Sequence, residues 1–194
     1  MAKKDPYREF LKQDFGKLFE QLELKDTQRH FLRSRWLDQV LWMEKKATVC
    51  RDRHYQLRLT AIILGVIVPV LVGLDVGEKE YAERTRQWLT ISLSAIVAAS
   101  AAVEEFFHYG ERWNHYRRTV ESLKTQGWQF SQLSGPYAKF STHKAAFGNF
   151  ADQVEEVIQR DVEIYVTQLA KPDEEKAQQS DAILVPDEDE EAIA

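Results

Sequence analysis

Two long uncharged apolar runs dominate the pattern of hydrophobic and polar positions along this chain. The first covers residues 59–74 and the second residues 88–103, at 16 residues each. Eleven residues of the first run are Leu, Ile or Val, and no polar face interrupts it. A helix that is apolar all round belongs in lipid or at the centre of a much larger protein. The pattern therefore predicts two membrane-spanning helices, at about residues 57–74 and 88–104.

Aromatic residues bracket both runs, as expected at the two surfaces of a bilayer. They are Tyr55 before the first run, Trp88 at the start of the second, and Phe106, Phe107 and Tyr109 after it. The second run is the weaker, because only six of its residues are Leu, Ile or Val. The alternative is a soluble helical bundle that buries a hydrophobic hairpin. We disfavour it because a chain of 194 residues is too small to cover both runs.

The segments around the runs have the spacing of amphipathic helices. The N-terminal stripe consists of Leu11, Phe15, Leu18 and Leu22. Few helix breakers occur between residues 28 and 74. The first span is therefore expected to be the continuation of a long cytoplasmic helix that precedes it. The second span is expected to run on through residues 104–126, with Gly127 ending it and a turn following at Gly135-Pro136.

A last helix is predicted over about residues 145–170. Its apolar stripe consists of Phe150, Val154, Ile158, Val162, Tyr165 and Leu169. The chain thus divides into an N-terminal amphipathic helix (1–27), a two-span domain with cytoplasmic helices (28–171) and a disordered acidic tail (172–194). The predicted fold is all-α: a two-span transmembrane hairpin whose long cytoplasmic extensions form a bundle. Because apolar stripes occur at both ends of a short chain, we also expect the subunits to associate.

Charge predicts the orientation. The net charge of −5 combines −8 from residue 172 onwards with +3 for the residues before it. Nine basic residues flank the runs on their outer sides: Lys45, Lys46, Arg51, Arg53, Arg58, Arg112, Arg117, Arg118 and Lys124. The connection between the runs has three, at Lys79, Arg84 and Arg86. The positive-inside rule therefore places both termini in the cytoplasm. No signal peptide is predicted, because the first residues are polar.

Small residues give the second span its most distinctive surface. They fall on two adjoining faces, one with Ser92, Ala95, Ala99 and Ala102 and the other with Ser94, Ala98 and Ala101. Small faces allow helices to approach closely in lipid. Two interpretations stay open: packing against the first span within the chain, or lining of a pore at the axis of an oligomer.

Polar residues at the cytoplasmic end of the second span are further candidates. Glu105 continues the stripe of Ser94, Ala98 and Ala101, whereas Glu104 lies one turn from His108 and two from Arg112. We expect Glu105 to face the axis, where a ring of carboxylates would favour cations. We expect Glu104, His108 and Arg112 to form a polar ladder. The alternative is that both carboxylates pair with arginines of neighbouring helices.

Two further groups of residues each have two interpretations. The basic residues Arg112, Arg117 and Arg118 beside the span could bind lipid headgroups or phosphate, or pair with nearby glutamates in a subunit contact. Gly65, Pro69 and Gly73 share one stripe of the first span. They indicate either a static kink or a gating hinge.

Chemistry of other kinds finds little support in the sequence. Cys50 is the single cysteine, which excludes an intrachain disulfide. Glu105 and His108 have the Glu-x-x-His spacing of di-iron bundles, but a second such motif is missing. Phosphate-binding loops and nucleophile motifs are also missing, so no catalytic residue, metal or cofactor is predicted. Because basic and acidic residues are interleaved, no nucleic-acid partner is predicted.

The order of several motifs around the two spans resembles that of a known family. In chain order they are Phe31-Leu-x-x-Arg35-Trp36, Tyr55-x-x-Leu-Arg58, Pro69, Glu104-Glu-Phe-Phe, Arg112-Trp113-x-x-Tyr116-Arg117, Gly135-Pro136-Tyr137 and Phe147-x-x-Phe150 before Val154-Glu155. Over residues 28–170 the chain resembles a bacterial two-transmembrane family, domain of unknown function 4231, of the SLATT superfamily. The resemblance implies an oligomeric protein of the bacterial inner membrane that forms pores as an effector in conflict systems. It also implies association with nucleotide-signalling modules, although the sequence contains no recognisable nucleotide-making or nucleotide-sensing domain.

Two functions of different classes follow as expectations. One is a homo-oligomeric pore or ion channel, gated by its cytoplasmic part. The other is a non-conducting membrane anchor or scaffold that recruits a cytosolic partner through its bundle and acidic tail. A hydrated face on the second span favours the pore, and a dry, interlocked face favours the scaffold. The sequence leaves the cytosolic partner, or any signalling nucleotide, unidentified.

Overall fold

The computed structural model describes residues 5–74, 80–164 and 166, and every regular element within these ranges is helical. This confirms the predicted all-α fold. The elements are α1 (Pro6–Gln21), α2 (Asp26–Phe31), a π-helical segment η1 (Leu32–Leu37), α3 (Asp38–Gly73), α4 (Glu80–Phe107), α5 (Tyr109–Ser131), a short 3-10 helix η2 (Gly135–Tyr137) and α6 (His143–Ile164). The predicted tail, residues 172–194, lies outside the described residues.

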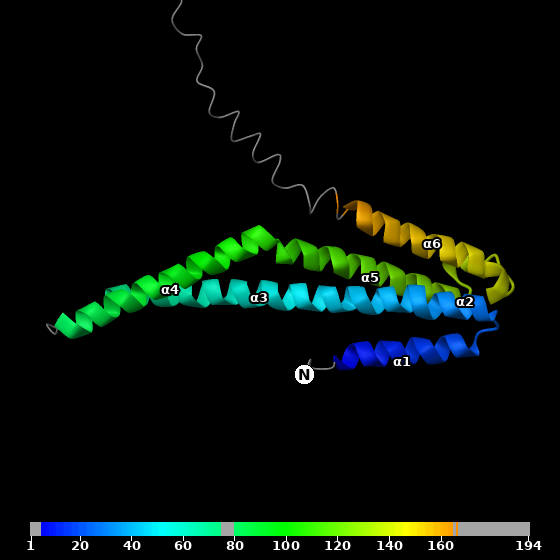
Figure 1. Ribbon diagram of the computed structural model, residues 1–194, viewed down its shortest axis with the longest axis horizontal. Coiled ribbons are helices and arrows are strands. Elements are labelled where there is room, and N and C mark those ends of the chain that lie inside the picture. Colours follow the sequence, from blue (N-terminus) through cyan, green and yellow to red (C-terminus); the bar gives the residue numbers. More distant parts are fainter. Residues whose placement is uncertain (1–4, 75–79, 165, 167–194) are drawn as a thin grey trace, which may run out of the picture.

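A single long helix forms the spine of the molecule (Figure 1). Elements α2, η1 and α3 follow one another without a break, giving one helix of 48 residues from Asp26 to Gly73. The predicted continuity of this segment is confirmed. Helix α4 lies along the C-terminal part of the spine and α5 along its N-terminal part, while α6 covers α5 and α1 lies on the opposite side of the spine.

The core lies at the N-terminal end of the spine, where α1, η1, α5 and α6 converge. Trp36 is fully buried there, with its ring 4.9 Å from that of Phe15 and 5.1 Å from that of Phe19. Its indole N–H donates to the Leu123 carbonyl at 3.0 Å, so the polar atom of this buried side chain is satisfied. These contacts join α1, η1 and α5 around one aromatic side chain.

A second aromatic cluster connects α5 to α6 through the predicted turn. The rings of Phe130 and Phe150 lie 4.4 Å apart, and the buried Tyr137 packs against both. The turn itself is confirmed at Gly135, which has a φ of 55° and is the first residue of η2. Burial raises the pKa of Tyr137 to about 12, and its hydroxyl donates to the side chain of Gln126.

The predicted amphipathic stripes are confirmed in part. In α1, Leu11 and Phe15 are buried as expected, but the helix ends at Gln21 and Phe19 joins its buried face. In α6, the helix begins at His143 and its buried face includes Phe150, Val154, Ile158 and Asp161. The prediction that Val162 lies on that face is wrong. Val162 is 55% exposed, whereas its neighbour Asp161 turns towards α5. Tyr165 and Leu169, also expected there, have side chains outside the described residues.

The predicted helix through residues 104–126 is wrong at one residue. His108 has φ 48° and ψ 45°, a left-handed conformation that separates α4 from α5. The expected end at Gly127 is also wrong, because α5 continues to Ser131 and Gly127 is buried beneath the Trp36 ring. This glycine therefore serves close packing rather than helix termination.

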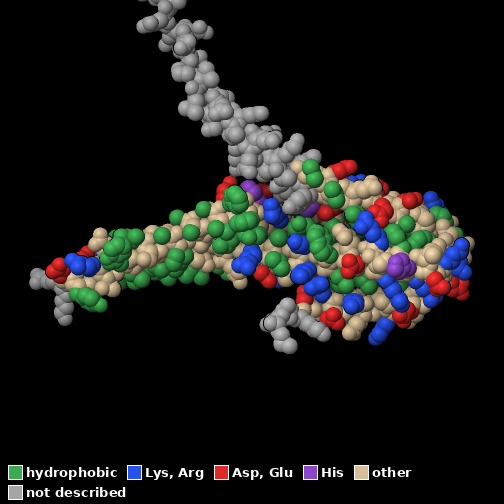
Figure 2. All heavy atoms as spheres, viewed as in Figure 1, with side chains coloured by type: hydrophobic (Ala, Val, Ile, Leu, Met, Phe, Trp, Pro, Cys, Tyr) green, Lys and Arg blue, Asp and Glu red, His purple; other side chains and the backbone are tan. Residues whose placement is uncertain are grey.

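Two helices are long and apolar enough to cross a membrane, judged by length and composition. One is the spine, and the other is α4. We call residues 57–73 of α3 together with α4 the apolar pair. It extends beyond the bundle, and hydrophobic side chains cover the face of it that Figure 2 shows. In the most apolar window of the spine no residue is buried, and in the most apolar window of α4 only 6% of the residues are buried.

Candidate functional site

The apolar pair packs through one face of each helix. On α3 the half-buried residues Leu57, Leu64, Val68 and Leu71 recur at intervals of three, four and seven. On α4 the corresponding face contains Thr90, Leu93, Val97, Ser100 and Glu104. Ser100 is the one described residue of α4 that is buried. This small residue therefore lies in the contact between the two helices.

The small residues that the sequence singled out lie elsewhere on α4. All of them are exposed in the single chain: Ser92, Ser94, Ala95, Ala98, Ala99, Ala101 and Ala102. At about 100° per residue, the row through Ser94, Ala98 and Ala101 adjoins the α3 contact, and the other row faces away from α3. The structure therefore does not place these residues in the packing of one span on the other. Whether they line a pore stays a prediction.

Large apolar residues occupy the remaining flank of α4. Leu89, Ile96, Val103 and Phe107 lie on the side of the α3 contact opposite Ser94 and Ala98, and all four are exposed. Helix α3 likewise exposes large side chains over its open surface. These include Leu59, Ile62, Ile63, Val66, Val70 and Val72. The open surface of the pair thus has a bulky side and a side with mostly small residues, on which Trp88, Ile91 and Phe106 are the large ones.

The far end of the apolar pair is held by Arg86. Its guanidinium donates to the carbonyls of Val72 at 2.7 Å and Leu74 at 3.1 Å, and pairs with Glu83 at 2.5 Å. The last carbonyls of a helix lack hydrogen-bond donors within the helix, and Arg86 supplies donors to these two. From the sequence, Arg86 was only one of the basic residues counted in the connection. The end of the predicted span at about residue 74 was the signal that a hydrogen-bond donor was needed there.

The predicted hinge in the first span shows no break. Gly65, Pro69 and Gly73 all lie within α3 on its exposed surface, and a Cβ added at either glycine would meet nothing within 4 Å. A hydrogen bond from the Leu74 N–H to the Val70 carbonyl, at 3.1 Å, continues the helical pattern past Pro69. A hinging role for these residues stays a prediction.

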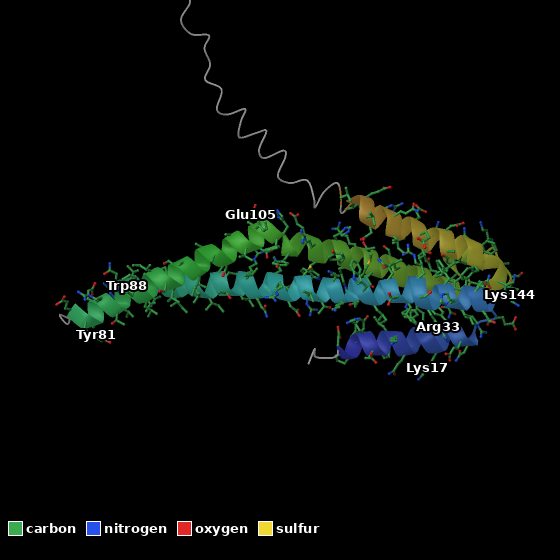
Figure 3. All side chains as sticks on the ribbon, in the orientation of Figure 1. Lys17, Arg33, Tyr81, Trp88, Glu105 and Lys144 are labelled. Atoms are coloured by element: carbon green, nitrogen blue, oxygen red, sulfur yellow. The ribbon has the colours of Figure 1, made fainter. Side chains whose placement is uncertain are left out.

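The backbone break lies instead at the other end of α4, and we call residues 104–110 the elbow. Its central contact joins Glu104 of α4 to His54 of α3, with Oε1 2.6 Å from Nδ1. The same oxygen accepts the backbone N–H of Gly110 at 3.2 Å. Glu104 therefore connects α3, α4 and the first turn of α5. In Figure 3, Glu105 lies at the crest of the elbow, pointing away from α3.

The polar ladder expected from sequence takes a different form. Glu104 bonds to His54 of α3 rather than to His108 or Arg112, and the left-handed turn at His108 interrupts the helical spacing that the ladder needed to reach Arg112. Arg112 lies near the thiol of Cys50. Burial raises the pKa of that thiol, and the positive charges of Arg112 and Lys46 oppose the shift.

The remaining arginines beside the elbow separate. Arg117 pairs with Glu44 of α3 at 2.7 Å and with Glu121 at 3.0 Å. The arginine thus pairs with nearby glutamates, as one alternative expected, but the pairs lie within one chain. Arg118 instead lines a groove between α5 and α6. A common lipid or phosphate site for the three arginines stays a prediction.

Glu44 belongs to a buried ionic cluster that the sequence did not reveal. Its side chain is 3% exposed and lies 3.3 Å from Nζ of Lys124, which is 8% exposed. Burial alone would lower the pKa of Lys124, but the hydrogen bond to Glu121 and the charge of Glu44 outweigh it and raise the pKa. The ammonium group also donates to the Tyr7 hydroxyl at 3.4 Å. The cluster thus joins α1, α3 and α5.

The groove between α5 and α6 has a volume of about 610 Å³, and both polar and apolar side chains line it. At its floor, Asp161 Oδ1 accepts the Thr119 hydroxyl at 2.8 Å and lies 2.9 Å from Nε2 of His115. Arg118 and Arg160 line the rim, together with Glu111. Among the described residues, no three His, Cys, Asp or Glu side chains are grouped so that they could hold a metal ion.

Comparison with known proteins gives a family but no function. No curated protein and no solved structure matches the chain. The model of one family, described as a protein of unknown function (DUF4231), matches residues 38–145, which cover all of α3, α4 and α5 and the turn that follows. The match spans more than half of the chain, and it confirms the family that the motifs resemble. The chain therefore belongs to the DUF4231 family of proteins of unknown function.

Proposed function

We propose that this protein is a homo-oligomeric pore of the bacterial inner membrane, in which the apolar pair spans the bilayer and α4 faces the axis. Both termini and the bundle lie in the cytoplasm. Its further role, as an effector in a bacterial conflict or signalling system of the SLATT superfamily, is proposed from the motif resemblance alone.

The exposure of the apolar pair supports insertion into a membrane. Its large side chains are open to the surroundings over the length of both helices, which a monomeric soluble protein rarely allows. Helix α4 has 28 residues and is therefore about 42 Å long, more than the roughly 30 Å of a hydrocarbon core. Arg86 and Glu83 at one end and Glu104 at the other would lie near the two surfaces.

The asymmetry of the open surface of the apolar pair carries the proposal of a pore. Large residues such as Leu59, Val66 and Ile96 suit lipid, whereas the small side of α4 lets another helix approach closely. Because Ser92 and Ser94 are exposed on that small side, it also offers hydroxyl groups that water could meet. A closed ring of identical subunits is the usual way to surround an axis, and it would place these faces inward.

The scaffold is the second candidate, and the groove between α5 and α6 favours it. That groove offers a polar surface on the bundle, where a cytosolic partner would dock without any ion path through the membrane. In a scaffold the small faces of α4 would interlock and stay dry. The two functions therefore differ in whether Ser94 and Ala98 meet water.

A paired cysteine experiment tests this difference. In a Cys50→Ala background, Ala98→Cys and Ile96→Cys place a thiol on the small side and on the bulky flank of the same helix. If α4 lines a pore, a charged thiol reagent added to reconstituted channels reduces the current of Ala98→Cys and leaves that of Ile96→Cys unchanged. Block at Ile96→Cys alone would reverse the assigned orientation. Assembled protein that neither conducts nor reacts at position 98 would favour the scaffold.

A further inference from the structure

We propose that the contact between Glu104 and His54 is a latch that holds the elbow bent, and that its release lets α4 and α5 join into one straight helix. This inference rests on the proposed function for its consequence, the gating of the pore. The latch itself is a property of the fold, and it can be measured without any current.

The bend is confined to one residue. On its N-terminal side, the His108 N–H donates to the Glu104 carbonyl at 2.9 Å, as within a helix. On its C-terminal side, the Arg112 N–H donates to the His108 carbonyl at 3.0 Å. His108 itself is left-handed, which is uncommon for a residue other than glycine and persists only where surrounding structure enforces it. Rotation of His108 alone into the right-handed region would therefore make α4 and α5 continuous.

The enforcing contacts meet at one carboxylate oxygen. Glu104 Oε1 contacts the His54 ring nitrogen and accepts the Gly110 N–H. One oxygen atom of α4 therefore contacts the spine on one side and α5 on the other. The side chains of His54 and Glu104 are 15% and 26% exposed. An ionised carboxylate can only accept, so the contact fits a His54 ring whose proton is on Nδ1.

Gly110 allows the bent form to close. A Cβ at this position would lie 3.0 Å from both Cε1 and Nδ1 of the His54 ring. The absence of a side chain therefore lets the first turn of α5 approach the imidazole closely enough to donate to Glu104. Beside this contact, Tyr55 of α3 and Trp113 of α5 pack with their ring centroids 5.6 Å apart, which keeps the start of α5 on the spine.

The two helices that meet at the elbow are anchored unequally. Helix α5 is fixed to the bundle by the fully buried Val120 and Leu123, whereas α4 contacts the spine mainly through half-buried residues. Release of the latch would therefore move α4 rather than α5. Glu104 ends the α3 contact face of α4, and the next residue, Glu105, ends its small-residue row, so this movement would displace the proposed pore lining.

Distance measurements between two spin labels test the latch. Leu89→Cys and Asn114→Cys place labels on exposed positions on either side of the elbow, in a Cys50→Ala background with labelled protomers diluted by unlabelled ones. In one continuous helix these residues would be about 38 Å apart, and a bent elbow brings them closer. We expect Glu104→Ala and His54→Ala each to shift the distribution towards the longer distance. The double variant should shift it no further than Glu104→Ala does, because that substitution alone removes both contacts of Oε1.

Substitutions of His108 provide a test that leaves the latch residues in place. His108→Gly makes the left-handed conformation easy and should keep the short distance, whereas His108→Ala should lengthen it. Leu133, with φ 46°, is the other left-handed non-glycine residue in the described ranges and lies at the far end of α5. Leu133→Gly and Leu133→Ala are therefore matched controls, expected to leave the distance unchanged.

Current recordings then separate the latch from the pore. In conducting channels, the variants Glu104→Ala, His54→Ala and His108→Ala should all change the open probability in one direction, and His108→Gly in the other. If the distance lengthens in oligomers that never conduct, the proposed latch is supported and the proposed pore is contradicted. If Glu104→Ala, His54→Ala and His108→Ala all keep the wild-type distance, the latch is overturned whether or not the protein conducts.

Discussion

The indole ring of Trp36 lies directly on the backbone of Gly127. A methyl group at Gly127 would overlap Cζ2 of the ring and lie 2.8 Å from Cη2. This contact brings η1 and α5 together at the centre of the core, and the indole N–H donates to Leu123 one turn earlier. The mutual position of the spine and α5 depends on it, and so does the position of the elbow at the other end of α5.

Substitution of Gly127 tests how closely the two helices must approach. Gly127→Ala should lower the free energy of unfolding by about 1–3 kcal/mol, because the added methyl group has to displace a buried ring. Gly148 lies inside α6, where an added Cβ would meet nothing within 4 Å. Gly148→Ala should therefore be stabilising, by about 0.4–1 kcal/mol. Denaturant unfolding of the detergent-solubilised protein measures both; equal effects would contradict the packing described for Trp36.

The buried cluster predicts a strong effect of Glu44. Glu44→Ala removes the partner of the buried Lys124 and should cost about 3 kcal/mol, the low end for a broken buried pair, because Lys124 keeps Glu121. Glu20 forms a pair of the same type with Arg33, but both side chains are more than half exposed. Glu20→Ala should cost less than about 1 kcal/mol. Similar losses for the two variants in the same unfolding assay would argue against a stabilising cluster.

The ion pair between Arg35 and Glu155 predicts a dependence on pH. Two hydrogen bonds, of 2.8 and 2.7 Å, join the groups, and the hydrogen bond from Arg35 lowers the pKa of Glu155 from its usual 4.5. A lowered carboxyl pKa stabilises the fold above the unfolded value, and this contribution is lost as the pH falls through the folded value. Both groups are partly exposed, so the contribution should stay below about 1 kcal/mol.

The measurement is the difference in melting temperature between wild type and Glu155→Gln. It should be largest near neutral pH and shrink as the pH falls below about 4.5. Glu156→Gln is the matched control, because Glu156 bonds to Gln153 and Arg160 of its own helix rather than to another helix. If the difference in melting temperature between wild type and Glu155→Gln grew on acidification, it would contradict a lowered pKa of Glu155.

The orientation in the membrane can be tested at two exposed residues that lie at opposite ends of the molecule. Figure 3 shows Tyr81 at the tip of the apolar pair and Lys144 at the bundle. In a Cys50→Ala background, Tyr81→Cys should react with an impermeant thiol reagent added to intact cells, and Lys144→Cys only after lysis. The reverse labelling would overturn the orientation inferred from the basic residues.

The long-range structure explains what could be predicted from sequence and what could not. The spine and α4 follow from two uncharged runs, because local composition alone decides such helices. The role of Gly127 does not follow, since a glycine near a helix end also fits a C-cap, and only Trp36, far away in sequence, shows the difference. Likewise, the inward turn of Asp161 depends on His115 and Thr119 of another helix.

The elbow was missed for a related reason. His108 is not a helix breaker, and its left-handed backbone depends on the contact that Glu104 makes with His54 of α3. The nearby Gly110 was a signal, but it allows a close approach rather than the turn itself. The exposed position of Ser94 and Ala98 was one of two interpretations that the periodicity permitted. The position of α3 against Ser100 shows that these two residues lie outside the α3 contact, and whether they line a pore stays a prediction.

Conduction by assembled protein is the central claim, and recordings from planar bilayers test it most directly. Oligomers isolated by gel filtration and inserted under a KCl gradient should give discrete currents, with a reversal potential displaced towards that of K⁺. The displacement should decrease in Glu105→Gln and persist in Glu104→Gln, because only Glu105 continues the small-residue row of α4. A reversal potential displaced towards that of Cl⁻ would contradict the assigned cation preference. Verified oligomers that carry no current would contradict the pore itself.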